Sequence, residues 1–289
     1  MSNDEDISSH NRAHYDSVTD AWAYVLGSNL HYGLFSGDTP GLDAATDRLV
    51  WEMAALARVP GAAGNSVRVL DVGCGIGNPA FLLHQRFGWN VTGITISPRG
   101  VAIGRELAEQ RGCSDSVRFV EADALDNGMP AESYNLLWQM ESSHLMHDKI
   151  ALFKENHRVL VLGGILVLCD LFLKRDLGLV EIYDLREELT MLESAFGKAK
   201  MSTMPYYRQC LEESGFADIE VHDVSEQVKP TLAAWKENVA QHRTRLQNLL
   251  PPGAIDDFVT TCDILQRFFD DGVMGYGLLR AVKPGSGGA

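Results

Sequence analysis

The sequence lacks long hydrophobic runs and clustered basic residues, and each absence excludes a class of protein. No apolar stretch reaches the roughly 20 residues that a membrane-spanning helix needs. Acidic side chains outnumber basic ones by 39 to 25, which gives a net charge of −14. Because an acidic surface repels nucleic acid and anionic lipid, we expect neither nucleic acid as a partner nor insertion into a membrane.

Cysteine is also sparse, and its pattern predicts neither disulfides nor a metal site. The five cysteines include no C-x-x-C pair. Cys74 and Cys169 lie in or beside apolar segments, where a free cysteine packs as a small hydrophobic residue. His144 and His147 have metal-ligand spacing but no apparent third ligand, so we expect no metal. The acidic, polar N-terminus does not resemble a secretory signal, and we expect a cytoplasmic protein.

The most informative stretch that the sequence does contain is residues 67–79. A short apolar, β-branched run ends at Asp71, and a helical pattern begins just after the stretch. The glycines that follow Asp71 at every second position are Gly73, Gly75 and Gly77. Glycine lets a backbone turn sharply and approach a ligand closely, and a helix N-terminus offers N–H groups to a carboxylate. The stretch therefore predicts a strand, a ligand-binding turn and a helix.

The glycine spacing argues against a phosphate-bearing ligand. Dinucleotide-binding turns have the pattern G-x-G-x-x-G with an acid about 20 residues further on. Here the spacing is G-x-G-x-G, Asn78 follows the last glycine, and residues 91–97 contain no acid. The Gly-Lys-Ser/Thr of a P-loop is also absent. The turn does not have the pattern of a pyrophosphate site.

Strand-like and helix-like segments alternate along the middle of the chain. Strands are predicted at 67–71, 91–96, 117–121, 134–139, 164–170, 219–224 and 276–282, and helices near 79–87, 98–111 and 147–161. This alternation predicts an α/β, Rossmann-like doubly wound fold with a mostly parallel sheet and helices on both faces. Ligands of such sheets bind outside the carboxyl ends of the strands.

The remaining segments surround this predicted core. We expect residues 1–63 to form an N-terminal helical segment that covers the ligand site and residues 64–283 to form the main domain. Segments at about 172–202 and 229–270 have helical patterns without strand alternation, and we expect them to form an inserted lid. The Gly-rich tail, 284–289, is expected to be disordered. The aromatic N-terminal segment also leaves a homo-oligomer open.

Short motifs along nearly the whole chain resemble those of the S-adenosylmethionine-dependent methyltransferases with a Rossmann-like fold. The glycine turn resembles their motif I. The other matching pieces are Tyr15-Asp16, residues 29–33, 93–97, 121–124 and 141–144, and Arg158-Val159-Leu160 before Gly163-Gly164. Together they resemble the small-molecule branch that includes the rebeccamycin sugar O-methyltransferase and the sterol and tocopherol methyltransferases. The resemblance implies a seven-stranded sheet with an antiparallel last strand, S-adenosylmethionine as cofactor, S-adenosylhomocysteine as product, and a natural-product acceptor in bacterial antibiotic biosynthesis.

The same resemblance implies which residues contact the cofactor. They are Tyr15, His31, Tyr32, Asp71, Gly73, Gly75, Asn78, Thr95, Ile96, Asp123, Ala124 and Gln139. The glycines would line the methionine half, and the Asp123 carboxylate would accept from the adenine amine. Thr95 offers one hydroxyl where many relatives have an acid that binds both ribose hydroxyls. Gly100 replaces a glutamine that is common in this branch.

Two further residues are candidates for catalysis. His144 follows the fourth predicted strand and, in Glu141-Ser142-Ser143-His144, matches the position of the catalytic histidine of this branch. Asp170 ends the fifth predicted strand and matches an acid of the same branch. A neutral histidine beside a carboxylate is suited to remove a proton from an acceptor hydroxyl. A hydrogen-bonded structural histidine is the alternative.

The acceptor and the chemistry stay open. Met204, Tyr206 and Tyr207 lie in or beside the predicted lid and are candidate acceptor contacts, although ordinary packing is the alternative. Aromatic faces stabilise cations, so methylation of an alkene or prenyl carbon through a cationic intermediate is a second hypothesis. A protein that binds S-adenosylmethionine without transferring its methyl group is a third.

Overall fold

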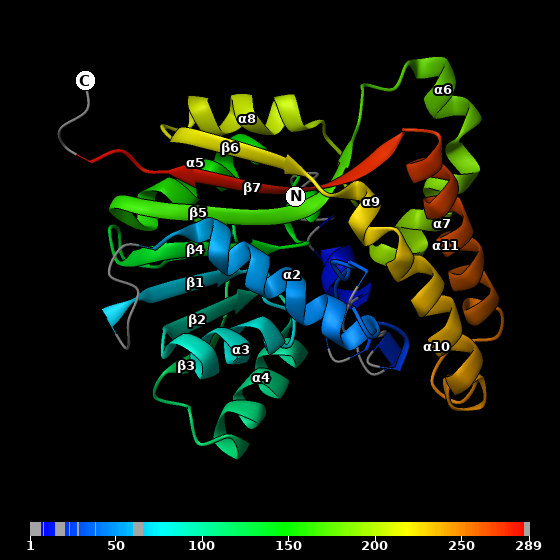
Figure 1. Cartoon of the computed structure of the whole chain (residues 1–289), viewed down its shortest axis with the longest axis horizontal. Helices are drawn as coiled ribbons and strands as arrows, with labels where there is room; N and C mark the ends of the chain where they lie inside the picture. Colours follow the sequence, from blue (N-terminus) through cyan, green and yellow to red (C-terminus); the bar gives the residue numbers. More distant parts are fainter. Residues whose placement is uncertain are drawn as a thin grey trace. The chain divides into compact units, whose positions relative to one another are not determined.

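A seven-stranded sheet in the order β3-β2-β1-β4-β5-β7-β6 runs through the protein (Figure 1). The computed structural model describes residues 7, 9–14, 21–22, 24–27, 29–37, 39–59 and 66–285. The strands are β1 (Arg68–Val72), β2 (Asn90–Thr95), β3 (Val117–Glu121), β4 (Tyr134–Met140), β5 (Leu160–Leu173), β6 (Ala217–Asp223) and β7 (Met274–Val282). The expected seventh strand is confirmed, and it lies between β5 and β6.

Strand directions also agree with the prediction. β1 pairs in parallel with β2 and β4, and the pairs β2–β3 and β4–β5 are parallel too. At one end of β5 the Gly163 amide donates to the Lys283 carbonyl, and at the other end the Lys174 amide donates to the Val273 carbonyl. From the first of these bonds to the second, the residue number rises on the β5 side from 163 to 174 and falls on the β7 side from 283 to 273. β7 therefore runs antiparallel to β5. The sheet is mixed and mostly parallel.

The helices lie between the strands and in the inserted segments. Their bounds are α2 (Leu42–Ala57), α3 (Asn78–Phe87), α4 (Pro98–Gln110), the short 3₁₀ helix η2 (Ser143–Leu145), α5 (Lys149–Val159), α6 (Leu179–Asp184), α7 (Arg186–Phe196), α8 (Met204–Glu213), α9 (Ser225–Val228), α10 (Pro230–Leu246) and α11 (Ala254–Asp270). α3 and α4 pack beside β2 and β3, and α5 packs with α8.

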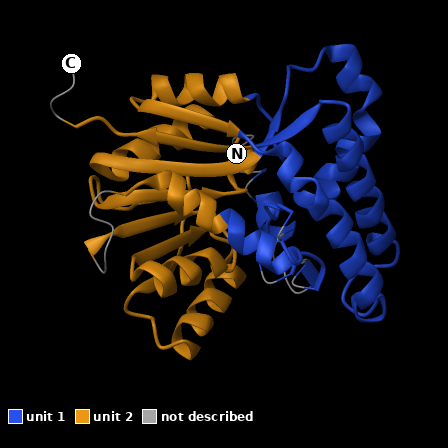
Figure 2. Cartoon of the chain, in the orientation of Figure 1, with its two compact units in different colours: residues 1–49, 171–203, 223–276 blue, residues 50–170, 204–222, 277–289 orange. Residues whose placement is uncertain are grey.

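The chain forms two compact units, which Figure 2 colours separately. Unit 1 consists of residues 1–49, 171–203 and 223–276, and unit 2 consists of residues 50–170, 204–222 and 277–289. The boundary between them falls within α2, β5, β6 and β7. The domain limits and lid segments predicted from the sequence stay predictions, and residues 286–289 of the predicted tail lie outside the described residues.

Unit 2 has its core around the central strands. Consecutive residues of β4 (Leu136, Leu137 and Trp138) and of β5 (166–169) are fully buried. Burial of successive residues, whose side chains point to opposite faces, means that both faces of these strands are covered. Continuous apolar runs in the sequence therefore identified these strands.

β5 is longer than the sequence pattern predicts. The preceding helix was expected to reach residue 161 but ends at Val159, and β5 continues to Leu173, into the segment expected to be helical. The Lys283 side chain binds the carbonyl of Leu160, and the Leu173 amide donates to the Ser202 carbonyl. These long-range hydrogen bonds keep both ends extended, and no local pattern in the sequence records them.

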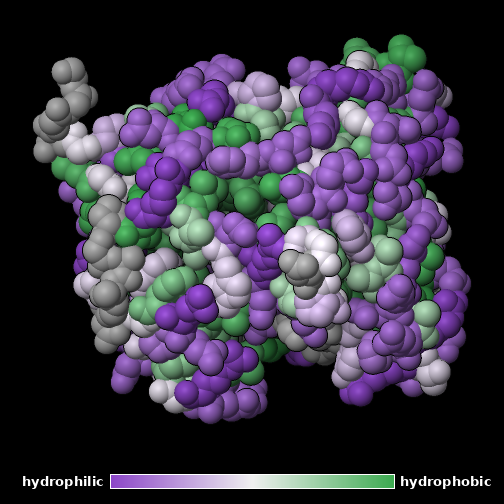
Figure 3. All heavy atoms as spheres, in the orientation of Figure 1, coloured by the Kyte–Doolittle hydropathy of each residue, from purple (hydrophilic) through white to green (hydrophobic). Residues whose placement is uncertain are grey.

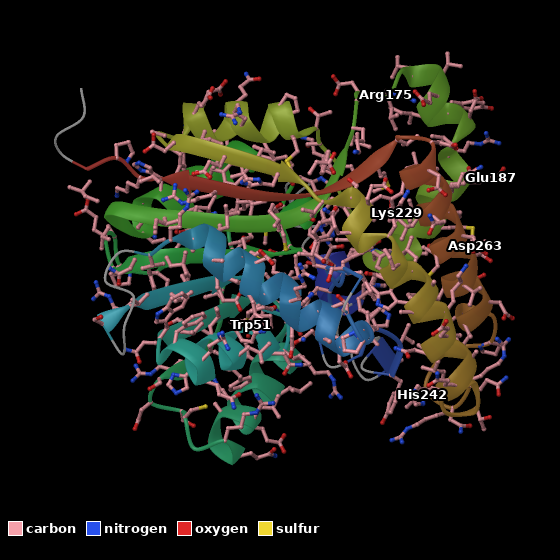
Figure 4. All side chains as sticks on the ribbon, in the orientation of Figure 1. Trp51, Arg175, Glu187, Lys229, His242 and Asp263 are labelled. Atoms are coloured by element: carbon pink, nitrogen blue, oxygen red, sulfur yellow. The ribbon has the colours of Figure 1, made fainter. Side chains whose placement is uncertain are left out.

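Unit 1 has an aromatic core. The rings of Trp235 and Tyr276 lie 4.7 and 5.3 Å from the ring of Tyr32. Helices α10 and α11 pack against each other. On their surface Lys236 contacts Asp263 at 2.6 Å, and Figure 4 labels Asp263 there. Such an exposed ion pair contributes little stability, whereas Tyr32, Trp235 and Tyr276 are buried in the hydrophobic core.

The helix α6 of unit 1 is exposed to an unusual degree. Leu179 is 87% exposed, and Val180 and Tyr183 are exposed as well. Hydrophilic residues cover most of the face in Figure 3, whereas hydrophobic atoms lie over α6 at its upper right edge. No residue of α6 is buried, so this helix adds nothing to the core of unit 1.

Candidate active site

The glycine turn after β1 adopts a backbone that favours glycine. The φ angles of Gly73, Gly75 and Gly77 are 79°, 55° and 85°, in the left-handed region that side chains disfavour. The amides of Gly73 and Cys74 both donate to the carbonyl of Ile94 in β2. The turn is thereby tied to the carboxyl end of the neighbouring strand.

At two of the three positions, neighbouring side chains leave no room for any residue larger than glycine. A Cβ atom on Gly73 would lie 2.4 Å from the Cβ of Ser142, and one on Gly77 would lie 2.1 Å from the ring of Phe119. At Gly75 a Cβ atom would meet no atom within 4 Å. Gly75 therefore borders open space, as a close approach of the backbone to a ligand requires.

Asp71 lies at the base of this turn with an unsatisfied carboxylate oxygen. The residue is 2% exposed, and its Oδ2 has no hydrogen-bond partner among the described residues. Burial raises the pKa of Asp71 to about 7. An unpaired buried oxygen of this kind is costly, and a ligand or water that donates a hydrogen bond would relieve the cost.

The ends of β2 and β3 bring the predicted adenosine contacts together. Thr95 pairs with Glu121 in the parallel ladder, and the Ala122 amide donates to the Thr95 carbonyl at 3.1 Å. The Thr95 hydroxyl already accepts from the Ser97 amide at 3.2 Å. Ile96 follows directly in the loop, half-buried. Thr95 therefore helps to shape the turn that begins α4.

Beyond β3, the Asp123 carboxylate accepts from the Leu125 amide at 2.9 Å, and Asp123 is exposed while Ala124 is buried. Asn78 begins α3 and is half-buried. The predicted contacts thus lie at the carboxyl ends of three adjacent strands. Their roles toward a cofactor stay predictions.

Gly100 has a steric explanation in the structure, whereas the side chain of Gln139 makes contacts inside unit 2. A Cβ atom on Gly100 would lie 2.7 Å from the carbonyl of Gly75, so this position next to the glycine turn has no room for a side chain. Gln139 is fully buried; its Oε1 accepts from Asn156 at 3.3 Å and its Nε2 lies 3.4 Å from the sulfur of Met146. The Gln139 amide is engaged within unit 2, and its predicted cofactor contact stays a prediction.

Of the predicted N-terminal contacts, two lie in the described part of unit 1. His31 is buried, and its Nδ1 lies 2.7 Å from the Tyr32 carbonyl, so Nδ1 carries the proton. Burial lowers the pKa of His31 to about 4, which keeps the ring neutral. Its Nε2 has no partner in the structure's described residues. Tyr32 belongs to the aromatic core, and Tyr15 lies outside the described residues.

His144 and Asp170 form a closely paired, buried dyad in unit 2. His144 lies in η2 after β4, and Asp170 lies in β5. The Nδ1 of His144 is 2.6 Å from Oδ1 of Asp170, and the His144 amide donates to Oδ2 at 2.9 Å. Burial alone would raise the pKa of Asp170, but His144, Ser143 and Lys149 together hold it below its ordinary value. Asp170 is therefore an ionised carboxylate that accepts a hydrogen bond from Nδ1–H of His144.

Ser143 and Lys149 also belong to this cluster, and sequence reasoning missed both. The Ser143 hydroxyl donates to Asp170 and lies 2.9 Å from the hydroxyl of Tyr207. The Lys149 ammonium donates to the carbonyl of Ser143 at 2.7 Å. Ser143 stands next to His144 in the quoted motif, so its position was the one available signal. Lys149 is the first residue of α5, and nothing in the sequence at that position signals a role in the cluster.

The predicted acceptor contacts lie together on α8, within unit 2. Tyr207 is 1% exposed with its hydroxyl on Ser143, Met204 is buried, and Tyr206 is exposed. Tyr207 therefore supports the dyad from within the fold. Contact of Met204, Tyr206 or Tyr207 with an acceptor stays a prediction.

The described residues contain neither a metal-binding cluster nor a membrane-spanning helix. No group of three or more His, Cys, Asp or Glu side chains there is arranged to hold a metal ion. No helix in the described ranges is long and apolar enough to cross a membrane.

Comparison with known proteins decides the family. A family model described as a methyltransferase domain matches residues 69–164. The 27-O-demethylrifamycin SV methyltransferase of Amycolatopsis mediterranei (strain S699) is 30% identical over 270 residues, which cover 93% of this chain and 95% of that protein. The chain belongs to the S-adenosylmethionine-dependent methyltransferases. The cofactor of this methyltransferase is S-adenosylmethionine, and its expected fold class is confirmed.

Solved structures extend the comparison. The crystal structure of the [4+2]-cyclase SpnF has a TM-score of 0.80 and 28% identity, covering 96% of this chain and 97% of that one. The mycolic acid cyclopropane synthase CmaA1, complexed with S-adenosylhomocysteine and CTAB, has a TM-score of 0.84, 17% identity, and coverage of 98% and 99%. The second likeness shows the fold alone.

The glycine turn of the methyltransferase fits this cofactor. S-Adenosylmethionine carries an amino-acid end and no phosphate, and the turn lacks the pyrophosphate pattern. The space beside Gly75 and the unpaired Oδ2 of Asp71 are features that a bound molecule with hydrogen-bond donors would complete.

Proposed function

We propose that the methyltransferase methylates a hydroxyl oxygen of a small, largely apolar natural-product acceptor in bacterial secondary metabolism, with His144 as the general base. The observation that carries the proposal is the buried His144–Asp170 pair at the carboxyl ends of β4 and β5. Ligands of doubly wound sheets bind at this edge. The relative named 27-O-demethylrifamycin SV methyltransferase supports an oxygen acceptor of natural-product type.

The tautomer of His144 suits it to accept a proton. Its Nδ1–H donates to the ionised Asp170, so Nε2 keeps its lone pair. We infer that the acceptor hydroxyl transfers its proton to Nε2 while its oxygen forms the new bond to the methyl carbon. The carbon–sulfur bond breaks and the sulfur keeps the electron pair. Asp170 stabilises the imidazolium until the proton passes to solvent.

S-Adenosylmethionine supplies, when bound, a methyl group that is already activated as a sulfonium. The protein therefore has two tasks, alignment and proton removal. Holding reactants in line contributes about 7–11 kcal/mol in favourable cases. A positioned base typically contributes about 10²–10⁴-fold. The His144–Asp170 pair would serve the second task.

The cofactor would be held by the glycine turn and the adjacent strand ends. Gly73 and Gly75 would lie along the methionine half, with Asp71 accepting a hydrogen bond beneath them. Thr95 and Asp123 would meet the ribose and the adenine. The support is the placement of these residues on adjoining strands β1, β2 and β3.

Product analysis tests the proposal. The full-length protein is incubated with S-adenosylmethionine labelled in the methyl group and a panel of apolar hydroxyl-bearing natural products. The proposal predicts S-adenosylhomocysteine together with an acceptor that carries a new O-methyl ether. A new C-methyl group would favour the cationic pathway, which contradicts His144 as the base for a hydroxyl. An acceptor that is rearranged without gaining a methyl group would contradict methyl transfer itself.

A further inference from the structure

Three hydrogen bonds to the Asp170 carboxylate come from one short turn. Oδ1 accepts from the ring of His144. Oδ2 accepts from the His144 amide and from the hydroxyl of Ser143. Two neighbouring residues of η2 therefore donate hydrogen bonds to both carboxylate oxygens. Any movement of this turn would change the orientation of the His144 ring.

The direction of each hydrogen bond follows from the number of protons available. A serine hydroxyl has one proton, and Ser143 gives it to Asp170, which is ionised and can only accept. The second contact of the Ser143 oxygen, 2.9 Å from the Tyr207 hydroxyl, must therefore be one in which Tyr207 donates. Burial and the charge of Asp170 raise the pKa of Tyr207 well above its ordinary value, so the phenol keeps this proton.

A buried cation holds the same turn from the other side. Lys149 is 1% exposed, and its ammonium donates to the carbonyls of Ser143 at 2.7 Å and of Met146 at 2.6 Å. The ammonium also lies 5.6 Å from the ring centre of Tyr207. Lys149 of α5, Tyr207 of α8 and Asp170 of β5 each contribute one group to the turn, and these three residues lie in unit 2.

We propose that Tyr207 and Ser143 are positioning residues that form a directed hydrogen-bond chain to Asp170 and so set the proton affinity of His144, with Lys149 fixing the turn. The inference rests on the proposed role of His144 as the base. The titratable and charged groups recorded around His144 are Asp170 of β5, Lys149 of α5 and Tyr207 of α8, and Cys210 of α8 lies near Tyr207 and Lys149.

The chain has a consequence with a definite sign. Hydrogen bonds to a carboxylate stabilise its charge and weaken its hold on a neighbouring proton. Loss of the Ser143 or Tyr207 hydroxyl leaves Asp170 less well stabilised. Asp170 then favours the protonated form of His144, so the titration midpoint of His144 rises.

The experiment is an NMR titration of the full-length, cofactor-free protein labelled with ¹⁵N in histidine. The His144 signals are assigned by their absence in His144→Gln. In Ser143→Ala the His144 midpoint should rise by on the order of one pH unit, as expected for loss of a hydrogen bond to a charged group. In Tyr207→Phe, which keeps the ring that packs near Phe153, the rise should be smaller.

A double variant tests whether Tyr207 acts through Ser143. If it does, Ser143→Ala/Tyr207→Phe has the same His144 midpoint as Ser143→Ala alone. Additive shifts, or an unchanged midpoint in both single variants, would overturn the chain. The matched control is Tyr134→Phe, which removes another largely buried hydroxyl of unit 2, one that contacts the sulfur of Met129. It should leave the midpoint of His144 unchanged.

The titration distinguishes failure of the hydrogen-bond chain from failure of the base assignment. If His144→Ala has normal turnover, the proposed function fails, whereas the titration still reports whether the chain exists. Once an acceptor is known, Tyr207→Phe should move the acidic limb of the turnover profile to higher pH and leave the KM for S-adenosylmethionine unchanged. A merely structural role of Tyr207 would not move that limb selectively.

Discussion

Asp71 and Asp170 are two buried carboxylates at the carboxyl ends of strands of one sheet, yet their surroundings are opposite. Asp71 is 2% exposed and Asp170 is 1% exposed. Burial without a partner at Oδ2 raises the pKa of Asp71 to about 7. Burial would also raise the pKa of Asp170, but His144, Ser143 and Lys149 keep it lowered.

The difference shows that partners, and not depth, decide the charge of a buried acid. Asp170 has its donors within the fold, so it is ionised before any ligand arrives, as the orienting acid of a base must be. Oδ2 of Asp71 has no hydrogen-bond partner among the residues that the structure describes. We infer that the bound cofactor donates the hydrogen bond that Oδ2 of Asp71 lacks. The carboxylate of Asp170 has its hydrogen-bond donors without any ligand. The predictions below separate the two sites, from the largest expected effect to the smallest.

The largest effect is expected at the His144–Asp170 pair. His144→Ala should lower turnover by about 10²-fold or more, because the acceptor hydroxyl loses its base, while the affinity for S-adenosylmethionine holds. Single-turnover rates and calorimetric titration measure the two quantities. His242→Ala, an exposed histidine of α10 that Figure 4 labels, is the control and should behave as the wild type. An unchanged rate in His144→Ala would remove the base assignment.

The next effect concerns the glycine turn. Gly75→Val should abolish binding of S-adenosylmethionine, because the valine would strain a backbone with φ 55° and fill the open space where the cofactor is expected. Gly112→Val is a matched control: its φ is 64° and a Cβ there also meets nothing within 4 Å, but it follows α4 away from the turn. Calorimetry should detect binding in the control alone. Retained binding in Gly75→Val would refute the assigned turn.

Asp71→Asn should separate stability from binding. An acid whose pKa is higher in the folded state contributes its full stability below the unfolded value near 3.8 and loses it as pH rises toward 7. Asparagine cannot ionise, so the cofactor-free variant should be more stable than the wild type at pH 8, by on the order of 4 kcal/mol at most. The affinity for S-adenosylmethionine should fall.

Thermal unfolding at several pH values measures the first effect of Asp71→Asn. The gain should vanish near pH 4, where the wild-type carboxyl is protonated as well. Asp115→Asn makes the same change of charge at an exposed position and should show no such gain. A variant that is equally stable at both pH values would show that Asp71 is not a strained acid.

The smallest effect is expected at Thr95. Its hydroxyl already accepts from the Ser97 amide, and the side chain is largely buried. Thr95→Val should therefore weaken binding of S-adenosylhomocysteine by less than about tenfold, the usual size for one neutral hydrogen bond. A larger loss in calorimetry would mean that this single hydroxyl anchors the ribose.

Sequence patterns predicted the features that repeat locally or follow strand order. The apolar runs identified β1 to β5, and the glycine spacing placed the turn after Asp71. The resemblance to the methyltransferase branch supplied His144 and Asp170 as candidates, and both lie at the carboxyl ends of neighbouring parallel strands, where ligands of such sheets bind. Each of these depends on residue type and short spacing, which a sequence displays.

The supporting contacts could not be predicted in the same way. Tyr207 donates to Ser143 from 64 residues further along the chain, and nothing in the local pattern of α8 distinguishes this tyrosine from Tyr206. Lys149 has the residue type of a solvated surface cation, yet the fold buries it against two carbonyls. Gln139 accepts a hydrogen bond from Asn156 of α5, while its cofactor contact stays a prediction. Such contacts exist only once distant segments have packed.

A site-resolved ¹³C titration of the aspartate carboxyls tests the central contrast most directly. In the cofactor-free protein Asp71 should titrate near pH 7, while Asp170 should stay ionised below pH 3.8. Saturating S-adenosylhomocysteine should move the Asp71 midpoint and leave that of Asp170 in place. If both carboxyls titrate together, or if the ligand moves neither midpoint, the assignment of Asp71 to the cofactor and Asp170 to the base is contradicted.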